Sequence, residues 1–584
     1  MFFTTHARSA PRPRPAPRAR STSMSRTHGL ARDTPSLAFL PQRIGAKLFP
    51  ASNRFVFQMQ SATTTVDMLG VPSTRWAWRL MPCLTDIAFI LPAAFLFLKL
   101  GGTETIFSDG DTGWHIRTGE WILAHGAVPR HDLFSYTKPG QPWFAWEWAW
   151  DILFALIHGT WGLAGVAFAT VLILGVVSVL LYKLVLNACG NDLLSFALTA
   201  VALCGSSIHW LARPHLFSWL FLLIYLHLLP LAQRGSNAAL AALPILMVFW
   251  VNIHGAFLIG IFLLLVTAGG EALEMLLFQG ESFRTAYDRS RRLLACTALC
   301  IAATFVNPYT WRLHRHVFQF LTDRKLIDNI QEYQSISFHS PPAIFFEVMI
   351  LLAAAAALWS FEERRITPAL LSVAWIHLAL IAARNIPLFL FIAAPLVGCW
   401  LQHVLLRLRP MRFIGVVSST ICEICEELKP MERAPRAFLL SALSILLMAG
   451  LFATGAKGFE GQFNPELFPA QAISLVERSP AKRIFTYDQW ADYLIYRLYP
   501  QKPDFIDGRS DFFGMPIVTA ARDALFAQYD WKTQLQHFGV DMILLKPDAP
   551  LCAVLKLSPD WAMRFDDGKV LVFEAVSLHP RSRK

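Results

Sequence analysis

Long apolar stretches alternate with short polar segments along most of the chain. A helix that crosses a membrane needs about 20 mostly apolar residues, and the pattern predicts about eleven such helices within residues 74–455. Their centres lie near residues 93, 172, 201, 223, 245, 263, 298, 350, 374, 396 and 446. The pattern is therefore typical of a polytopic α-helical membrane protein.

The segments on either side of these helices have a different character. Residues 1–73 are rich in Arg, Pro and Ser and poor in acids, which is typical of a disordered basic segment. Residues 456–584 contain short apolar runs at 483–486, 541–545 and 570–574 and a helical pattern at 517–529. This second pattern predicts a small α/β domain after the last membrane helix.

The orientation of the helices follows from the basic residues in the short loops. Arg75 and Arg79 precede the first helix, and Lys183, Arg234, Arg289, Arg291, Arg292, Arg364, Arg365, Arg407, Arg409 and Arg412 fall on the same side by alternation. That side is cytoplasmic, because short cytoplasmic loops are enriched in Lys and Arg. The N-terminus is then cytoplasmic, while the large first outer loop (102–150) and the segment 456–584 lie outside.

Composition supports a membrane protein and changes the meaning of the charge. The chain is 54% hydrophobic and 16% charged, which is unlike a soluble protein. Its formal net charge is +11, but residues 1–80 hold twelve Lys and Arg against Asp33 and Asp67. The remainder is nearly neutral and has no basic face for nucleic acid. The expected partners include membrane lipids and exclude nucleic acid.

The first outer loop concentrates ionisable and aromatic residues. Between Ser108 and Asp151 it carries six tryptophans together with Asp109, Asp111, His115, Glu120, His131, Asp132 and Glu147. Hydrocarbon cannot host so many ionisable groups, so this stretch lies outside the bilayer core. Asp109-Gly110-Asp111 has two interpretations: a pair of reactive carboxylates, or a turn followed by a helix N-cap.

Five further polar clusters fall at the predicted outer ends of helices. They are Arg213-Pro214-His215, Asn252-x-His254-Gly255, Asn307-Pro308-Tyr309, Glu332-Tyr333 and Arg384-Asn385. Their common side predicts a shared cavity at the outer membrane boundary. Structural alternatives are backbone-bonded histidines at 215 and 254, a helix–helix hydrogen bond at 252 and a solvated loop at 332. Arginines that snorkel as topology signals belong on the other side, which favours a binding function for Arg213 and Arg384.

These motifs resemble a known superfamily. The run Asp109-x-Asp111-Thr-Gly-Trp-His115, with Gly119-Glu120 and Trp146-Glu147-Trp148, resembles the first outer loop of bacterial membrane proteins in the GT-C glycosyltransferase superfamily. The later clusters resemble the same group, and the resemblance covers about residues 85–575. The superfamily includes oligosaccharyltransferases, protein O-mannosyltransferases and the aminoarabinose transferase of lipid A. The resemblance implies a GT-C-like fold in the bacterial inner membrane, with a periplasmic C-terminal domain.

The resemblance also implies an activity and residue roles. The activity would be transfer of a sugar from a polyprenyl-phosphate carrier to an extracytoplasmic glycan, lipid or protein acceptor. Asp111, or else Asp109, would be the general base, and Arg213, His215 and Arg384 would bind the lipid phosphate. Supporting candidates are His115, Glu147, Asn252, His254 and Glu332. Some relatives use a divalent metal such as Mg²⁺ or Mn²⁺, but Thr112 replaces the second acid of their motif, so metal dependence stays open.

A second, weaker resemblance lies in the C-terminal segment. Trp490-Ala491-Asp492-Tyr493 is similar to the Trp-Trp-Asp-Tyr-Gly stretch with which oligosaccharyltransferases read an acceptor peptide. Ala491 and Leu494 depart from that motif, so the role is not carried over. Packing by the two aromatic residues, with a turn at 507–509, is the alternative.

Two other functions compete with the enzyme. A transporter or lipid flippase would place ionisable residues near the middle of its helices and would show internal repeats. A catalytically inactive assembly protein would keep the fold and lose the reaction. The polar clusters at one face, followed by a large polar segment, favour the enzyme.

Overall fold

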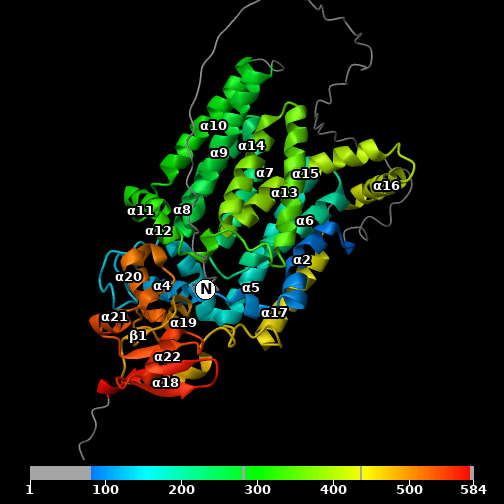
Figure 1. The fold of residues 1–584 in the computed structure, drawn as a ribbon. Coiled ribbons are helices and arrows are strands. Elements are labelled where there is room, and N and C mark those ends of the chain that lie inside the picture. Colours follow the sequence, from blue (N-terminus) through cyan, green and yellow to red (C-terminus); the bar gives the residue numbers. More distant parts are fainter. Residues whose placement is uncertain (1–79, 279–282, 434–436, 579–584) are drawn as a thin grey trace, which may run out of the picture. The chain divides into compact units, whose positions relative to one another are not determined.

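The computed structural model describes residues 80–278, 283–433 and 437–578, so the predicted disordered segment 1–73 lies outside the described residues. A helix lies at each of the eleven predicted centres (Figure 1). These helices are α2 (Leu84–Lys99), α5 (Trp148–Cys189), α6 (Asp192–Ser206), α7 (His215–Gln233), α8 (Asn237–Ile253), α9 (Leu258–Leu277), α10 (Phe283–Ala303), α13 (Ala343–Glu362), α14 (Ile366–Ile381), α15 (Ile386–Leu408) and α17 (Leu439–Thr454). The prediction of a mainly helical chain is confirmed.

Many of these helices suit a membrane. Within the described ranges, six segments are long and apolar enough to cross one: Trp148–Cys189, Asp192–His209, His215–Gln233, Gly255–Leu277, Ala343–Glu362 and Ala383–Leu408. Helices α8, α14 and α17 are apolar but shorter. The helices thus support a multi-pass membrane protein, while the number of eleven crossings stays a prediction.

Helix α5 has a break that matters for the site. Its residue Gly162 has a φ of 62°, a left-handed conformation that glycine adopts readily. The segment after the break packs in the bundle, where α5 contacts α2, α6, α7 and α15. The segment before it starts at Trp148 and carries Asp151 and His158, whereas the segment after it has no ionisable side chain before Tyr182.

Short elements connect the helices. They are α3 (Thr103–Ile106), α4 (Asp111–His125), η1 (Ser207–His209), η2 (Gly255–Phe257), α11 (Trp311–Thr322), α12 (Arg324–Ile327), η3 (Gln331–Tyr333), η4 (Ala383–Asn385) and α16 (Ile414–Arg433). The predicted first outer loop is therefore partly helical. Asp111 is the first residue of α4, and the Asp109 side chain accepts a hydrogen bond from its backbone N–H at 2.9 Å.

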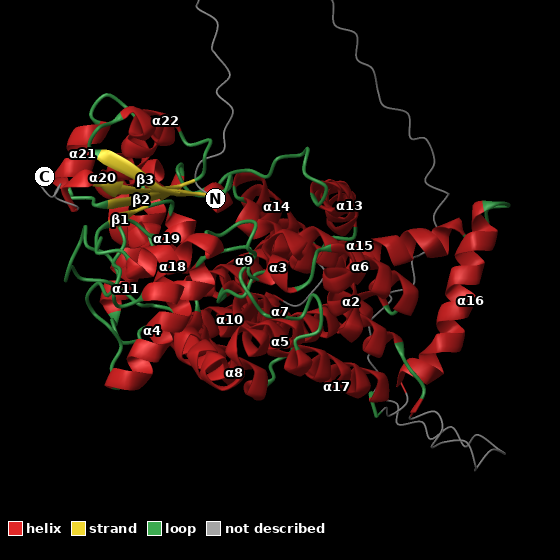
Figure 2. Cartoon of the chain, turned by 90° about the horizontal axis from the view of Figure 1, so that it is seen from below, coloured by secondary structure: helices red, strands yellow, loops and turns green. Residues whose placement is uncertain are grey.

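The chain after α17 contains a four-stranded sheet with helices (Figure 2). The elements are η5 (Ala470–Ala472), α18 (Ile473–Arg478), β1 (Ile484–Phe485), α19 (Asp488–Leu498), α20 (Ser510–Leu525), α21 (Trp531–His537), β2 (Met542–Leu545), α22 (Pro550–Leu557), β3 (Trp561–Asp566), β4 (Leu571–Ala575) and η6 (Val576–Leu578). The strand order is β1-β2-β4-β3; β1 and β2 are parallel and the other pairs antiparallel. Each of the three predicted runs contains a strand, and β3 was not predicted.

Helix α19 lies directly on helix α4. The backbone N–H of Gly110 donates to the side chain of Gln489 at 2.7 Å. A Cβ atom at Gly110 or at Gly113 would overlap the backbone oxygen of Gln489 or Asp492, respectively, so only glycine permits this approach. The C-terminal segment is thus packed against the first outer loop and not merely tethered by α17.

Candidate functional site

A cavity of about 350 Å³ lies where these elements meet. Its wall is formed by α4, the loop before α5, the chain around α7, η2, α11, η3 and η4, and the stretch Gly508–Asp511. Seven of the ten predicted site residues line it: Asp111, Glu147, Arg213, His215, His254, Glu332 and Arg384. Asp109, His115 and Asn252 lie outside the lining. Four of the five sequence clusters therefore contribute to one cavity, whereas Asn307-Pro308-Tyr309 lies outside its lining. The Tyr309 hydroxyl instead donates to the carbonyl of Pro129 in the first outer loop, at 2.9 Å.

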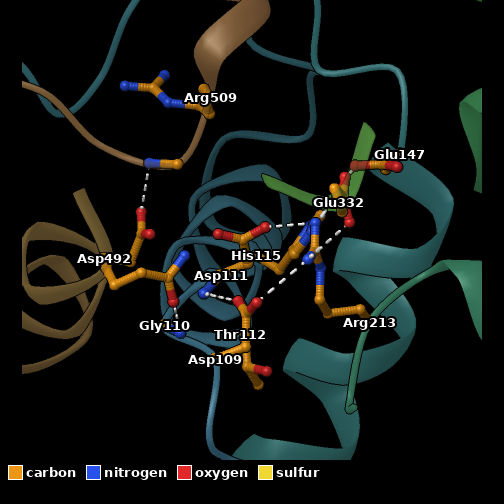
Figure 3. Close-up of polar contacts among 12 residues, drawn as sticks. Asp109, Gly110, Asp111, Thr112, His115, Glu147, Arg213, Glu332, Asp492 and Arg509 are labelled. Carbon is orange, nitrogen blue, oxygen red and sulfur yellow. Dashed lines mark hydrogen bonds and ion pairs between the residues drawn. The ribbon is translucent and has the colours of Figure 1, made fainter. Parts of the chain in front are cut away.

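Arg213 is the centre of the acidic cluster (Figure 3). Its guanidinium lies 2.5 Å from Oδ2 of Asp111, 3.2 Å from Oδ2 of Asp109 and 3.7 Å from Oε2 of Glu332. Local bonds fix this geometry: Thr112 donates to the carbonyl of Ala212 at 3.0 Å. The beginning of α4 and the turn before α7 are therefore held together, and the carboxyl of Asp111 with them.

Arg384 forms the second cationic group of the cavity. Its guanidinium lies 3.0 Å from Oε1 of Glu332 and stacks over the ring of Tyr333, 4.5 Å from the centroid. Glu332 thus bridges the two arginines. Burial alone would raise the pKa of Glu332, but Arg384 and Arg213 outweigh it and hold that pKa well below its ordinary value. Glu332 is therefore an ionised residue of the cavity wall and not the solvated loop residue that was the structural alternative.

Glu147 lies between two histidines at the other side of the cavity. Its carboxyl is 3.7 Å from Nε2 of His115 and 3.6 Å from Nε2 of His254. The other ring nitrogen of His115 lies 2.6 Å from Asp151, and that of His254 lies 2.7 Å from Oγ of Ser218. Burial raises the pKa of Glu147 to about 8. At neutral pH the carboxyl of Glu147 is therefore mainly protonated and uncharged, and it lies between the hydrogen-bonded rings of His115 and His254.

Two predicted residues have structural partners. Asn252 donates to the carbonyls of Val248 and Val306, at 2.7 and 2.8 Å, and accepts from the indole of Trp148 at 2.8 Å. This is the helix–helix role that the sequence allowed as an alternative. His215 contacts the backbone carbonyl of His209 at 2.7 Å, although its side chain also lines the cavity.

The C-terminal segment contributes residues that the sequence did not single out. Gly508, Arg509, Ser510 and Asp511 line the cavity, and Asp492 of α19 is fully buried behind it. His209 also lines the cavity. The weak motif around Asp492 and the position of His209 just before Arg213 were the only signals in the sequence.

Arg509 fixes this stretch to the first outer loop. Its guanidinium lies 2.5 Å from Asp507 and 2.8 Å from Asp132. It also faces the rings of Phe134 and Trp143, with centroids 4.9 and 4.5 Å away. Such buried pairing and cation–π contact hold Gly508 in place beside Asp111.

Burial changes the proton affinity of Asp111. Its side chain is 7% exposed, and burial raises its pKa to about 7, against the opposing effect of Arg213 and with a smaller contribution from Asp109. A carboxyl that titrates near neutral pH suits a general base. The cavity therefore holds a buried carboxyl that can exchange a proton near neutral pH, paired with Arg213 and in the same lining as Arg384.

The acids of the cavity fit a cation poorly. Within residues 80–278, 283–433 and 437–578, no three His, Cys, Asp or Glu side chains form a metal-binding group. The three carboxylates that approach one another all point to the guanidinium of Arg213, which occupies the place a divalent ion would take. The residues present at this point of the cavity therefore do not fit a divalent metal.

Comparison with solved structures finds a similar fold in an oligosaccharyltransferase, one of the enzyme classes whose superfamily the sequence motifs resemble. The apo oligosaccharyltransferase of Archaeoglobus fulgidus has a TM-score of 0.50 and 11% identity, over 79% of this chain and 69% of that one. At this identity the likeness shows the fold alone. No family model matches the chain, and no curated protein matches it.

Two further structures are similar at lower scores. AglB from Archaeoglobus fulgidus, in complex with an inhibitory peptide and a dolichol-phosphate, has a TM-score of 0.47 and 10% identity, covering 83% of this chain and 73% of that one. ArnT from Cupriavidus metallidurans, bound to undecaprenyl phosphate, has a TM-score of 0.42 and 13% identity, covering 87% and 99%.

Proposed function

We propose that this chain is an integral-membrane glycosyltransferase that transfers a sugar from a polyprenyl-phosphate carrier to an extracytoplasmic acceptor. The observation that carries the proposal is the single cavity in which the Asp111 carboxyl lies beside Arg213, with Arg384 in the same wall. This combination of a base and cations is what such a transfer requires.

The proposed reaction has two coupled parts: attack by the acceptor and departure of the phosphate. Ionised Asp111 takes the proton from an acceptor hydroxyl, whose oxygen forms a bond to the anomeric carbon of the sugar. The bond from that carbon to the phosphate oxygen breaks, and the polyprenyl phosphate leaves as an anion without needing an acid.

Arg384 is the better candidate for holding the phosphate. Within the described part of the chain it has one ion-pair partner, Glu332, at 3.0 Å, whereas Arg213 is shared among three carboxylates. An arginine fork binds phosphate oxygens by charge-assisted hydrogen bonds. Arg213 would first hold Asp111 in place and then contribute to the phosphate, whereas His215 uses its Nε2–H to donate to the carbonyl of His209.

The base assignment is tested by a pair of isosteric variants. Asp111→Asn and Asp109→Asn are expressed in a strain that lacks the gene, and surface glycans are compared by mass spectrometry at matched protein levels. The Asn variant at position 111 is expected to lose the glycan, while that at 109 keeps it in part. Retained transfer by the first and loss by the second would move the base to Asp109, and retention by both would refute the enzyme.

The sidedness is tested by labelling. We propose that the segment after residue 456 is extracytoplasmic, with a cytoplasmic N-terminus. Cysteine is introduced at Tyr529, which is fully exposed, and at Glu363, an exposed residue between α13 and α14. An impermeant thiol reagent added to intact cells is expected to label the first position only. Labelling of the second position only would discard the proposed site.

A further inference from the structure

The carboxyl of Asp492 faces the carboxyl of Asp111. Oδ1 of Asp492 accepts a hydrogen bond from the backbone N–H of Gly508 at 2.9 Å. Oδ2 of Asp492 and Oδ1 of Asp111 are both buried, and no other group within the described residues donates a hydrogen bond to either of them. Both oxygens flank Gly508: a Cβ atom there would lie 2.8 Å from the first and closer still to the second.

The two sides of Asp111 therefore differ. Figure 3 shows Arg213 and Asp492 approaching its carboxyl from opposite directions. Oδ2 is held by a guanidinium, whereas Oδ1 faces another acid. We call Asp111 and Asp492 the carboxyl pair.

Two ionised carboxylates in this arrangement would be costly. Both side chains are more than nine-tenths buried, and like charges at close range in a buried site cannot both ionise without a large penalty. One proton between the two facing oxygens removes the repulsion and supplies the donor that both oxygens lack. The carboxyl pair is expected to hold that proton at neutral pH.

The surrounding charges decide which member carries the proton. Asp111 is beside Arg213, whose other carboxylate neighbours are Asp109 and Glu332. Among the residues that the structure describes, no lysine, arginine or histidine forms an ion pair with Asp492, and no cation is among the causes of its pKa shift. Burial raises the pKa of Asp492, and the nearby acids Asp111, Asp507 and Asp488 raise it further. Arg509 holds the charge of Asp507. The proton therefore belongs on Asp492 and the negative charge on Asp111.

We propose that Asp492 is a positioning residue, whose protonated Oδ2 donates a hydrogen bond to Oδ1 of Asp111 and so keeps the base ionised and oriented. The inference rests on the proposed function only in naming Asp111 as the base. It makes α19 part of the reactive site: the C-terminal segment supplies the donor on one side, and the helical part supplies Arg213 on the other.

The first test needs no substrate. The full chain and its Asp492→Asn variant are purified in detergent, and their infrared spectra are compared at pH 7. The difference spectrum is expected to contain the carbonyl band of one protonated carboxyl. Asp560→Asn is the control, because that half-exposed carboxyl is paired with Lys532 and should give no such band. A wild-type spectrum without the extra band means that Asp492 is ionised, and the proposal is then wrong.

The second test compares two substitutions by the surface-glycan assay. An Asn side chain keeps the acceptor for Gly508 and places an N–H donor where the protonated oxygen was, so Asp492→Asn is expected to retain transfer within about threefold. Asp492→Ala removes the donor and is expected to lose at least about tenfold, as a misplaced catalytic group does. In Asp492→Ala the acid limb of the pH profile should also move to higher pH, because Asp111 has lost a hydrogen bond to its ionised form.

The outcomes separate the possible failures. Equal loss in both variants would mean that Asp492 acts as a charged carboxylate, and no loss in either would mean that it positions nothing; each result overturns the proposal. If Asp111→Asn retains transfer, the proposed function fails, while the infrared difference still reports on the proton of the carboxyl pair. If the alanine variant does not fold, the infrared band and the Asn variant still decide.

Discussion

Replacing Gly508 by alanine perturbs the carboxyl pair without removing any polar group. The φ of Gly508 is not in the left-handed region, so alanine can adopt the same backbone conformation, and the cost is steric. The new Cβ would lie 2.8 Å from Oδ2 of Asp492 and nearer to Oδ1 of Asp111, whereas ordinary contact begins near 3.4 Å. Asp111 cannot turn away freely, because Arg213 holds its other oxygen at 2.5 Å.

The size of the effect follows from the required movement. The Asp111 carboxyl has to retreat by roughly 1 Å, and a displacement of that size in a reacting group can cost about a hundredfold in rate. A hundredfold loss corresponds to about 2.7 kcal/mol of transition-state stabilisation. Gly508→Ala is therefore expected to lower transfer about a hundredfold while the protein remains folded.

The assay compares this variant with a matched glycine. Gly450→Ala in α17 is the control, because a Cβ there meets nothing within 4 Å. Both variants are expressed at equal levels and compared by surface-glycan mass spectrometry and by thermal unfolding in detergent. A reacting group at Asp111 would not tolerate a displacement of this size. If folded Gly508→Ala nevertheless retained transfer within about twofold, Asp111 would not be the base, and the base would have to be another group in the cavity.

Three other predictions concern stability, pH and phosphate. Arg509→Met leaves two buried carboxylates without their cation and is expected to lower the free energy of unfolding, measured by chemical denaturation, by about 3–5 kcal/mol. The control Lys532→Met, at an exposed ion pair, should change it by less than about 1 kcal/mol. The free energy of unfolding should fall as the pH rises from about 4.5 towards 8, because the pKa of Glu147 is raised to about 8 in the folded state and deprotonation then favours the unfolded chain. In unfolding curves recorded across that pH range, Glu147→Gln should make this fall less steep. An unchanged slope would contradict the prediction. Arg384→Lys should weaken binding of undecaprenyl phosphate about tenfold in a tryptophan-fluorescence titration, while Arg497→Lys, at an exposed position, leaves it unchanged; equal affinities would remove Arg384 from the phosphate site.

The helices were predictable because their signal is local. An apolar run long enough to cross a membrane is visible in the sequence itself, and a helix lies at each predicted centre. The shared cavity could be inferred too, since the polar clusters around Arg213, Glu332 and Arg384 fell on one side by alternation. The ends of elements were less predictable: the helix expected to reach residue 529 ends at Leu525, before Ala527, whose φ of 49° ends the helical run.

The contacts between distant segments could not be predicted. Strand β3 lacks apolar alternation because most of it is half-buried or exposed, so no pattern marks it. The approach of α19 to α4 depends on two glycines that leave room for a neighbouring backbone, and glycines in a turn-like sequence look the same without that neighbour. Asp492 was therefore seen only as part of a weak motif, although its carboxyl lies with that of Asp111, the proposed base, beside Gly508.

The close packing of α19 on α4 also limits how this protein can be dissected. In a fragment that begins after α17, the side of α19 that packs on Gly110 and Gly113 would be exposed to solvent. The carboxyl of Asp492, proposed to be protonated in the intact protein, would then be in water and would ionise. The helical bundle left behind would keep Arg213 and Arg384 but lose the part of the cavity wall formed by Gly508–Asp511. Neither half then represents the intact protein, and chimaeras with proteins of the same fold should exchange α4 and α19 as a unit.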